Sequence, residues 1–289
     1  MTYVETIKLR YDDLTKSEKK VADYVIGAGD KLINQTLTDV KKATGVGDAT
    51  IVRFCQKLNY QGFSDLKIAI AKVAYKQDTA KESPDSYVDL VSNRLMDAIR
   101  STSALVNVKD LNRGIELIHN AQRIFIFGVG SSGVTAMDMA SRFLREGIQA
   151  EAITDSHYQA QNAALMNEHD LVIAFSLSGS TKDVFDSCKV AKQNGAKLII
   201  VTNHLLSPIA KQGDVVLQTA VEELLMNGGS LSGKISQLCV CDLLITGYTI
   251  TYHINSLKMR ERVLRSIINK SMDYPFQEAN FQFNGFFAI

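Results

Sequence analysis

Five short apolar runs in the middle of the chain constrain its fold more than any other feature. Each run is continuously apolar or β-branched, and segments of helical length separate the runs. Strands that are buried on both faces have this pattern, and parallel sheets covered by helices are built from such strands. The sequence therefore predicts a three-layer α/β domain with a five-stranded parallel sheet. The strands are expected at residues 123–129, 150–154, 170–176, 197–203 and 214–219.

Glycines and hydroxyl side chains cluster where the first and the third of these runs end. GVGSSG follows the first run and SLSGST follows the third. The carboxyl ends of parallel strands are the ligand-binding edge of an α/β sheet, because each following helix directs unpaired N–H groups and the positive end of its dipole there. Hydroxyls beside such donors can cradle an oxyanion. The expected residues are Gly128, Gly130, Ser131 and Ser132 in the first loop and Ser176, Ser178, Gly179, Ser180 and Thr181 in the second.

Two other interpretations fit parts of this pattern. Serine and threonine are ordinary helix caps, so one hydroxyl-rich loop alone would favour capping, whereas two such loops after two strands favour a phosphate site. GVGSSG also has the GxGxxG spacing of dinucleotide-binding proteins, and Asp155 lies about 25 residues beyond Gly130 as a candidate partner for a ribose. A nucleotide-binding module therefore remains an alternative, although it gives the second loop no role.

Residues 15–76 are expected to form short helices, and part of this segment has helix-turn-helix spacing. The apolar positions of a first helix would include Leu37, Val40 and Ala43, a turn with two glycines would follow, and Asp48 would be the N-cap of the second helix. The buried face of that helix follows the i, i+3, i+4, i+7 pattern through Ile51, Phe54, Cys55 and Leu58. Thr50, Arg53 and Lys57 fall on the opposite side, where a major groove could use their donors.

The distribution of charge supports a nucleic-acid partner. The whole chain has a formal net charge of +1, which argues against a polyelectrolyte partner along its full length. Residues 41–76, however, contain seven basic and two acidic side chains, so this segment carries +5 and the rest carries −4. Together with the helix-turn-helix spacing, this predicts binding to double-stranded DNA. The predicted DNA-binding residues are Asp48, Thr50, Arg53, Lys57 and Lys67.

Cysteine and histidine patterns give no support for a metal site or a disulfide framework. The four cysteines, Cys55, Cys188, Cys239 and Cys241, are expected to be buried free thiols, and the five histidines lack the spacing of metal ligands. No cofactor is expected. The sequence shows no secretory leader and no apolar run long enough to span a bilayer, so a cytoplasmic location without a membrane partner is expected.

These motifs together resemble the RpiR/MurR family of transcriptional regulators, over about residues 4–269. The segment ATIVRFCQKLNYQGFSDLK is similar to the helix-turn-helix of that family, and residues 111–251 look like a sugar isomerase (SIS) domain with its GxGxS turn and SxSGxT loop. The resemblance implies a flavodoxin-like fold. It also implies phosphosugar contacts from Ser132, Ser176, Ser178 and Thr181, with Ser131 nearby. Two residues depart from the family pattern: Asp48 stands where serine is common, and Lys234 where arginine is expected.

The sequence thus predicts a regulator of sugar or amino-sugar metabolism genes whose DNA binding a phosphosugar effector controls. A homodimer or homotetramer is expected. The predicted boundaries are a helix-turn-helix domain at 1–76, a linker at 77–86, a SIS domain at 87–270 and a Phe-rich tail without an assigned role at 271–289.

The alternative is a phosphosugar isomerase or related enzyme with an accessory helical domain. Such an enzyme needs a positioned acid or base. Glu222 and Glu223, which follow the fifth predicted strand, are the candidates for that role. In a regulator, Glu223 would instead contact the sugar without chemistry.

Overall fold

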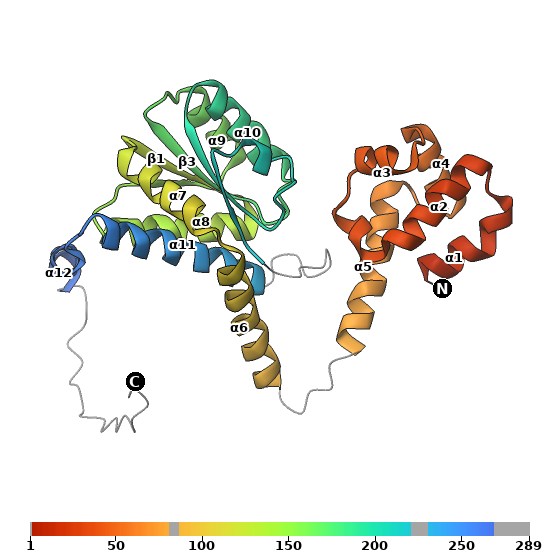
Figure 1. The fold of residues 1–289 in the computed structure, drawn as a ribbon, viewed down its shortest axis with the longest axis horizontal. Coiled ribbons are helices and arrows are strands. Elements are labelled where there is room, and N and C mark those ends of the chain that lie inside the picture. The colour runs from red at the N-terminus through yellow and green to blue at the C-terminus, as the bar shows by residue number, and fades with distance from the viewer. Residues whose placement is uncertain (1, 81–86, 221–230, 269–289) are drawn as a thin grey trace.

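The computed structural model describes residues 2–80, 87–220 and 231–268 (Figure 1). In the first of these segments the regular elements are helices joined by short turns, as the sequence predicts. Helix α5 continues beyond residue 76, so helix occupies the first four residues of the predicted linker. The elements are α1 (Tyr3–Arg10), η1 (Tyr11–Asp13), α2 (Lys16–Ala28), η2 (Gly29–Asn34), α3 (Leu37–Thr44), α4 (Asp48–Lys57) and α5 (Phe63–Ala80).

Threonine is the N-cap residue of three of these helices. Thr2, Thr15 and Thr36 each accept a hydrogen bond from the backbone three residues later, and the acidic side chain at that later position accepts one from the threonine N–H. These capping boxes satisfy donors that a helix start leaves unpaired. The helices then enclose one apolar cluster, which includes Val21, Val25, Val40, Ile51, Phe54, Leu66 and Ile70.

Helices α3 and α4 form the expected helix-turn-helix, with one correction at the start of α4. Gly45 ends α3 in the left-handed conformation, with φ of 69°. The N-cap of α4 is Gly47 rather than Asp48, because the backbone is still extended at Gly47 and Asp48 already belongs to the helix. An acidic residue in this first turn still interacts favourably with the helix dipole. The predicted buried face is confirmed, since Ile51, Phe54, Cys55 and Leu58 are all buried.

The five predicted strands form one parallel sheet in the order β2-β1-β3-β4-β5. This confirms the predicted α/β architecture. The strands are β1 (Arg123–Phe127), β2 (Glu151–Ile153), β3 (Asp170–Phe175), β4 (Lys197–Thr202) and β5 (Val215–Gln218). The helices of this domain are α6 (Tyr87–Leu105), α7 (Val108–Asn120), α8 (Gly130–Arg145), α9 (Ser156–Ala164), α10 (Lys182–Gln193), α11 (Leu231–Thr251) and α12 (Ser256–Ile267), with a short η3 (Ala210–Gln212) before β5.

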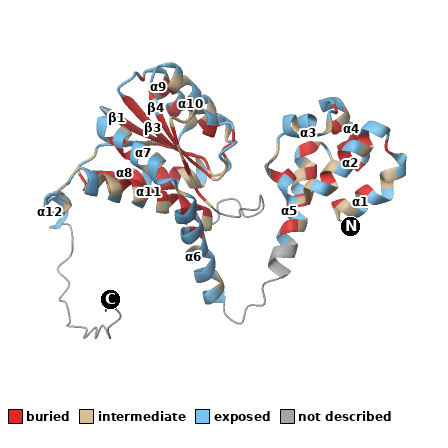
Figure 2. Ribbon diagram, in the orientation of Figure 1, coloured by how far each residue is buried: buried red, intermediate tan, exposed pale blue. Residues whose placement is uncertain are grey.

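Helices cover both faces of the sheet, which explains why its strands are continuously apolar (Figure 2). One apolar cluster joins the sheet to α7, α8 and α11, and a second cluster on the other face joins it to α9 and α10. Every residue of β3 is buried. Helix α6 packs against α11. None of the helices in the described ranges is long and apolar enough to cross a membrane.

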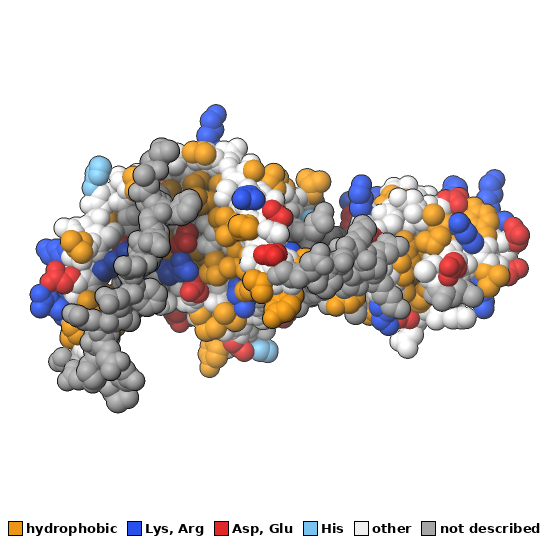
Figure 3. Space-filling model, turned by 90° about the horizontal axis from the view of Figure 1, so that it is seen from below, with side chains coloured by type: hydrophobic (Ala, Val, Ile, Leu, Met, Phe, Trp, Pro, Cys, Tyr) orange, Lys and Arg blue, Asp and Glu red, His pale blue; other side chains and the backbone are white. Residues whose placement is uncertain are grey.

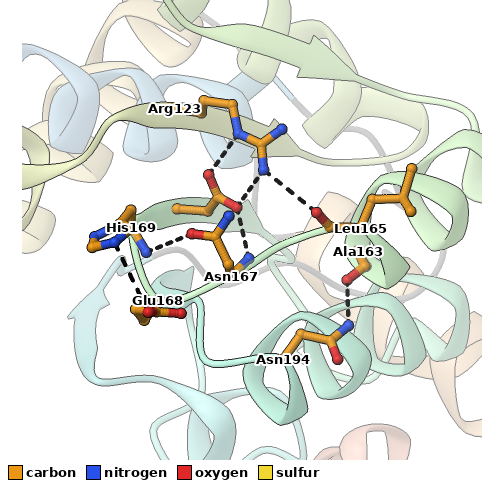
Figure 4. A network of polar contacts seen from close by, with 8 residues as sticks. Arg123, Ala163, Leu165, Asn167, Glu168, His169 and Asn194 are labelled. Atoms are coloured by element: carbon orange, nitrogen blue, oxygen red, sulfur yellow. Dashed lines mark hydrogen bonds and ion pairs between the residues drawn. The ribbon is translucent and has the colours of Figure 1, made fainter.

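An ion pair ties β1 to β3 at the end of the sheet where these strands begin (Figure 4). Arg123 Nε and Nη2 donate to the two carboxylate oxygens of Asp170 at 2.7 and 2.6 Å, and the Asn167 N–H donates to Asp170 at 2.8 Å. Burial acts to raise the pKa of Asp170, but the bonds from Arg123 and Asn167 outweigh it and lower the pKa below the ordinary 3.8. Asp170 is therefore held as a buried carboxylate.

Asp170→Asn is expected to lower the free energy of unfolding by about 2 kcal/mol at neutral pH, because charge-assisted hydrogen bonds are lost. A depressed native pKa contributes stability above the unfolded-state value and loses it as pH falls. The difference between the two proteins should therefore shrink below pH 3.8. Denaturant unfolding measures it at each pH, with Asp186→Asn as the control, because Asp186 pairs with Lys182 on the exposed surface. Equal stability at neutral pH would contradict the assignment.

Candidate functional site

The sheet changes its direction of winding between β1 and β3. These strands are neighbours, with Phe127 opposite Ala174 at their carboxyl ends. From β1 the chain continues into α8, and from β3 into α10, and these two helices lie on opposite faces of the sheet. Such a switch point leaves a crevice at the carboxyl ends of the strands, which is the usual ligand-binding position in this fold. Both hydroxyl-rich loops therefore lie at the same point of the sheet.

The first loop is held close to the start of α8. A Cβ atom at Gly128 would lie 2.6 Å from the backbone oxygen of Ser132, so no other residue fits there without moving the backbone. Gly130 has φ of 57°, a conformation that glycine adopts most readily. Ser131 and Ser132 are half-buried in the first turn of α8. The loop thus brings these glycines and serines to the carboxyl end of β1, and their contact with a ligand stays a prediction.

The second loop folds tightly over the end of β4. Ser176 is only 2% exposed, and its hydroxyl lies 3.3 Å from the hydroxyl of Thr181. Ser178 is exposed, and its Oγ accepts hydrogen bonds from the backbone and the side chain of Ser180. Gly179 has φ of 63°, and a Cβ atom there would lie 2.1 Å from Ser207 Oγ. Here glycine is required both by the backbone conformation and by the lack of space.

Neither of the helices that start at these loops has a side-chain cap. The N-cap of α10 is Thr181 and that of α8 is Val129, and neither side chain bonds the helix backbone. The capping interpretation of the hydroxyls therefore does not account for them. By contrast, Asp155 does cap a helix, since its carboxylate accepts hydrogen bonds from His157 and Tyr158 at the start of α9. This contact gives Asp155 a structural role and weakens the case for a nucleotide site.

Two buried glutamines support the first loop, and sequence reasoning missed both. Gln159 on α9 donates to the carbonyl oxygens of Gly128 and Ile153, at 3.2 and 2.6 Å. Gln237 on α11 donates to Ser132 Oγ at 2.9 Å and accepts from Thr135 at 3.1 Å. Their side chains come from helices that lie far from the loop in sequence. The one available signal was for Gln237, whose amide lies in the largely apolar stretch ISQLCVC.

Several sequence predictions concern residues outside the two hydroxyl-rich loops. Glu222 and Glu223 lie outside the described residues, so the proposed sugar contact of Glu223 stays a prediction. Lys234 is half-buried in the first turn of α11. Among the described residues, no three His, Cys, Asp or Glu side chains gather as a metal site requires. Cys55, Cys188 and Cys241 are buried free thiols, as expected, and Cys239 is half-buried.

The predicted DNA-binding residues differ in their surroundings. Arg53 is exposed on α4 and donates to Thr50 Oγ1 at 3.1 Å, so these two side chains form one outward-facing group. Asp48 is exposed, and Lys41 Nζ lies 3.7 Å from its carboxylate. Lys67 is half-buried and donates to the carbonyl oxygen of Gln35, and burial lowers its pKa. Contact of Thr50 and Arg53 with DNA stays a prediction.

Lys57 turns towards its own domain. Its ammonium lies 2.7 Å from Oε2 of Glu18, whose side chain is 4% exposed. Burial acts to raise the pKa of Glu18, but hydrogen bonds from Lys57 and Thr15 lower it overall. Lys57 therefore links α4 to α2, and its contact with DNA stays a prediction.

The chain joins a helix-turn-helix domain to an α/β domain with two hydroxyl-rich loops at its switch point. This combination defines a class of DNA-binding regulators that carry a ligand-binding domain. The family described as "Helix-turn-helix domain, rpiR family" matches residues 1–77, and "SIS domain" matches residues 117–247. An HTH-type transcriptional regulator of Haemophilus influenzae is 35% identical, covering 81% of this chain and 85% of its own length. The chain belongs to the RpiR family of HTH-type transcriptional regulators.

Two further proteins are similar to this chain over most of its length. The HTH-type transcriptional regulator RpiR of Escherichia coli K12 is 28% identical, covering 82% of each chain. The solved structure of "the Vibrio vulnificus NanR protein complexed with ManNAc-6P" superposes with a TM-score of 0.77 and 28% identity, covering 93% of this chain and 99% of that one. The similarity thus extends over both domains. The chain is a transcription regulator with a helix-turn-helix and a SIS domain.

Proposed function

We propose that this regulator binds operator DNA through α4 and that a phosphorylated sugar or amino sugar at the switch point controls this binding. The observation that carries the proposal is the pair of uncapped helix N-termini, α8 and α10, which follow two hydroxyl-rich loops at the carboxyl ends of the neighbouring strands β1 and β3. The complex of NanR with ManNAc-6P supports this ligand class. The regulated genes would then be those of sugar or amino-sugar metabolism.

The chemistry of the crevice favours a phosphate attached to a polar molecule. Residues 128–132 and 176–181 contain no charged side chain, so their donors are hydroxyls and backbone N–H groups. Helix N-termini stabilise an anion through these N–H groups and the helix dipole. Hydroxyls both donate and accept hydrogen bonds, so they suit the hydroxyls of a sugar as well as phosphate oxygens. A dianion is thus held without a counter-charge that would attract any anion.

The effector can act only by binding one arrangement of the regulator more tightly than another. A sugar phosphate that prefers the arrangement with low DNA affinity would release the operator, and the opposite preference would strengthen binding. In either case, binding of the effector and of the operator must be coupled within one protein.

An apolar stripe on α6 supports the proposal of a homodimer or homotetramer. Ala98 and Thr102 are buried, and the same helical face continues towards the N-terminus of α6 through Leu95, Val91 and Val88. Val91 is 47% exposed and Val88 is 58% exposed. Hydrophobic side chains form several patches on the side of the molecule that Figure 3 shows. A second copy could cover the α6 stripe, and sedimentation velocity measures the number of copies.

The relatives favour a regulator over an isomerase, since the named ones are transcriptional regulators over both domains. The proposed place of action is the cytoplasm, where the regulator meets its operator DNA.

A thermal-shift panel of hexose 6-phosphates and N-acylhexosamine 6-phosphates tests the effector class. A ligand at 100 times its Kd should add about 2.7 kcal/mol of stability. The matching unphosphorylated sugars serve as controls, and an equal response to both sets would contradict the proposal.

Arg53→Ala is expected to weaken specific operator binding by about 1 to 3 kcal/mol, because an arginine that contacts a base loses its paired hydrogen bonds. Arg53 is exposed and its one described partner is Thr50, so folding should change little. Gel-shift titration at fixed salt measures the effect. Arg100→Ala on α6 removes an exposed arginine outside this domain and is the matched control. Wild-type affinity for the Arg53 variant would exclude this residue from the DNA interface.

A further inference from the structure

Gln237 joins the ligand-binding edge of the sheet to α11. Its side chain is buried, with 2% of the residue exposed, and it lies between two hydroxyls on α8. Its Nε2 atom is 2.9 Å from Ser132 Oγ, and its Oε1 atom is 3.1 Å from Thr135 Oγ1. Ser132 belongs to the predicted ligand set, whereas Thr135 is fully buried one turn later. One amide thus bridges a hydroxyl of the predicted ligand set and a hydroxyl of the core.

The chemistry of these groups gives the chain of hydrogen bonds a direction. The Thr135 hydroxyl donates to Oε1, because a carbonyl oxygen can only accept. This bond holds the amide with Nε2 towards Ser132, and Nε2 can only donate. Ser132 Oγ is therefore an acceptor in its contact with Gln237. The Ser132 proton remains for a different acceptor, and bonds in such a chain strengthen one another.

We propose that Gln237 is a positioning residue that sets Ser132 as a hydrogen-bond donor to the effector. The effector atom at Ser132 must then be an acceptor, such as a phosphate or carbonyl oxygen, and not a hydroxyl that needs to donate. Gln237 thus selects for a hydrogen-bond acceptor in the effector although it does not touch the effector. This inference rests on the proposed phosphosugar function and adds a determinant of specificity at the same site.

A double-mutant cycle between Gln237 and Ser132 tests the proposal. Gln237→Met keeps the length of the side chain and removes both hydrogen bonds. We expect it to raise the Kd for N-acetylmannosamine 6-phosphate, or for the tightest-binding phosphosugar of the panel, about tenfold, because Ser132 is then free to turn away. In the Ser132→Ala background the same change should alter the Kd less than about twofold, because Gln237 then has no hydroxyl to orient.

Two additional variants separate positioning from packing. Gln237→Glu keeps the shape but replaces the donor with an acceptor, so Ser132 should donate to the carboxylate and the Kd should rise more than in Gln237→Met. Ser236→Ala is the control, because Ser236 is a buried polar neighbour on α11 that bonds its own helix at Gly233. This variant should bind the same sugar phosphate with wild-type Kd. Thermal unfolding of each variant without sugar reports any loss of folding.

The outcomes distinguish this inference from the proposed function. A rise in the Kd of Gln237→Met that disappears in the Ser132→Ala background supports the positioning role of Gln237. If wild-type protein binds the sugar phosphate but Gln237→Met changes the Kd equally in both backgrounds, Gln237 contributes only to packing, and the proposed positioning of Ser132 is overturned. If the wild-type protein binds no member of the phosphosugar panel, the effector class is wrong, and the inference fails together with the proposed function.

Discussion

Replacing Ser176 and Ser178 together with alanine is expected to abolish the response to phosphosugar while operator binding persists. Both serines follow the end of β3, in the loop to which the proposal assigns the phosphate. Loss of one hydrogen bond to a charged group costs about 1.5 to 3 kcal/mol, so loss of two should raise the Kd by about a hundredfold or more. Calorimetry with the tightest-binding phosphosugar measures this, and operator titration on the same sample measures DNA binding.

Folding should change much less than ligand binding. Ser178 is exposed, and the main contact of the Ser176 side chain is the Thr181 hydroxyl at 3.3 Å. We expect a loss of about 1 kcal/mol of stability from that neutral contact. Ser101→Ala with Ser141→Ala removes two exposed hydroxyls from helices of the same domain and is the matched control. Tight ligand binding by the Ser176 and Ser178 double variant would place the phosphate elsewhere.

The sheet could be predicted because its signal is local. A strand that is covered on both faces must be apolar along most of its length. Strands β3 and β4 show this most fully, because every residue of β3 and all but the first residue of β4 are buried. The glycines and serines at the ends of β1 and β3 then predict a cradle, since parallel strands end at one edge. Each of these inferences needs only a short segment of sequence.

The contacts that the sequence did not predict join residues far apart in the chain. Gln237 reaches Ser132 from another helix, and Glu18 reaches Lys57 from α2. Helical periodicity placed Lys57 on the outer face of α4, but it could not show that a buried carboxylate from α2 lies within reach. The N-cap of α4 was misplaced for a related reason: Asp48 is a good cap by residue type, whereas the backbone enters the helix one residue earlier. Tertiary packing decided the contacts of Gln237 and Lys57, and the local backbone conformation decided the start of α4.

Gly179→Ala is expected to displace the second loop and remove phosphosugar binding. The left-handed backbone at φ of 63° costs a residue with a Cβ atom roughly 1 to 2 kcal/mol. The new Cβ atom would also lie 2.4 Å from Ser207 Cβ and 2.9 Å from Thr202 Oγ1, so the loop has to move. Overpacking of this kind adds about 1 to 3 kcal/mol. We therefore expect a total loss of about 3 kcal/mol, measured as lower stability in denaturant unfolding and weaker ligand binding in calorimetry.

Gly130→Ala separates the two contributions, because Gly130 has nearly the same backbone conformation, with φ of 57°, but open space where its Cβ atom would lie. It should lose only the conformational part, about 1 kcal/mol. Gly179→Ala combined with Ser207→Gly removes the two shortest contacts and should recover part of the loss, with Thr202 Oγ1 still close. If Gly179→Ala costs no more than Gly130→Ala, the packing of the loop on Ser207 does not hold the phosphate cradle in place. If it costs more and the Ser207 change restores binding, this contact fixes the geometry on which the effector depends.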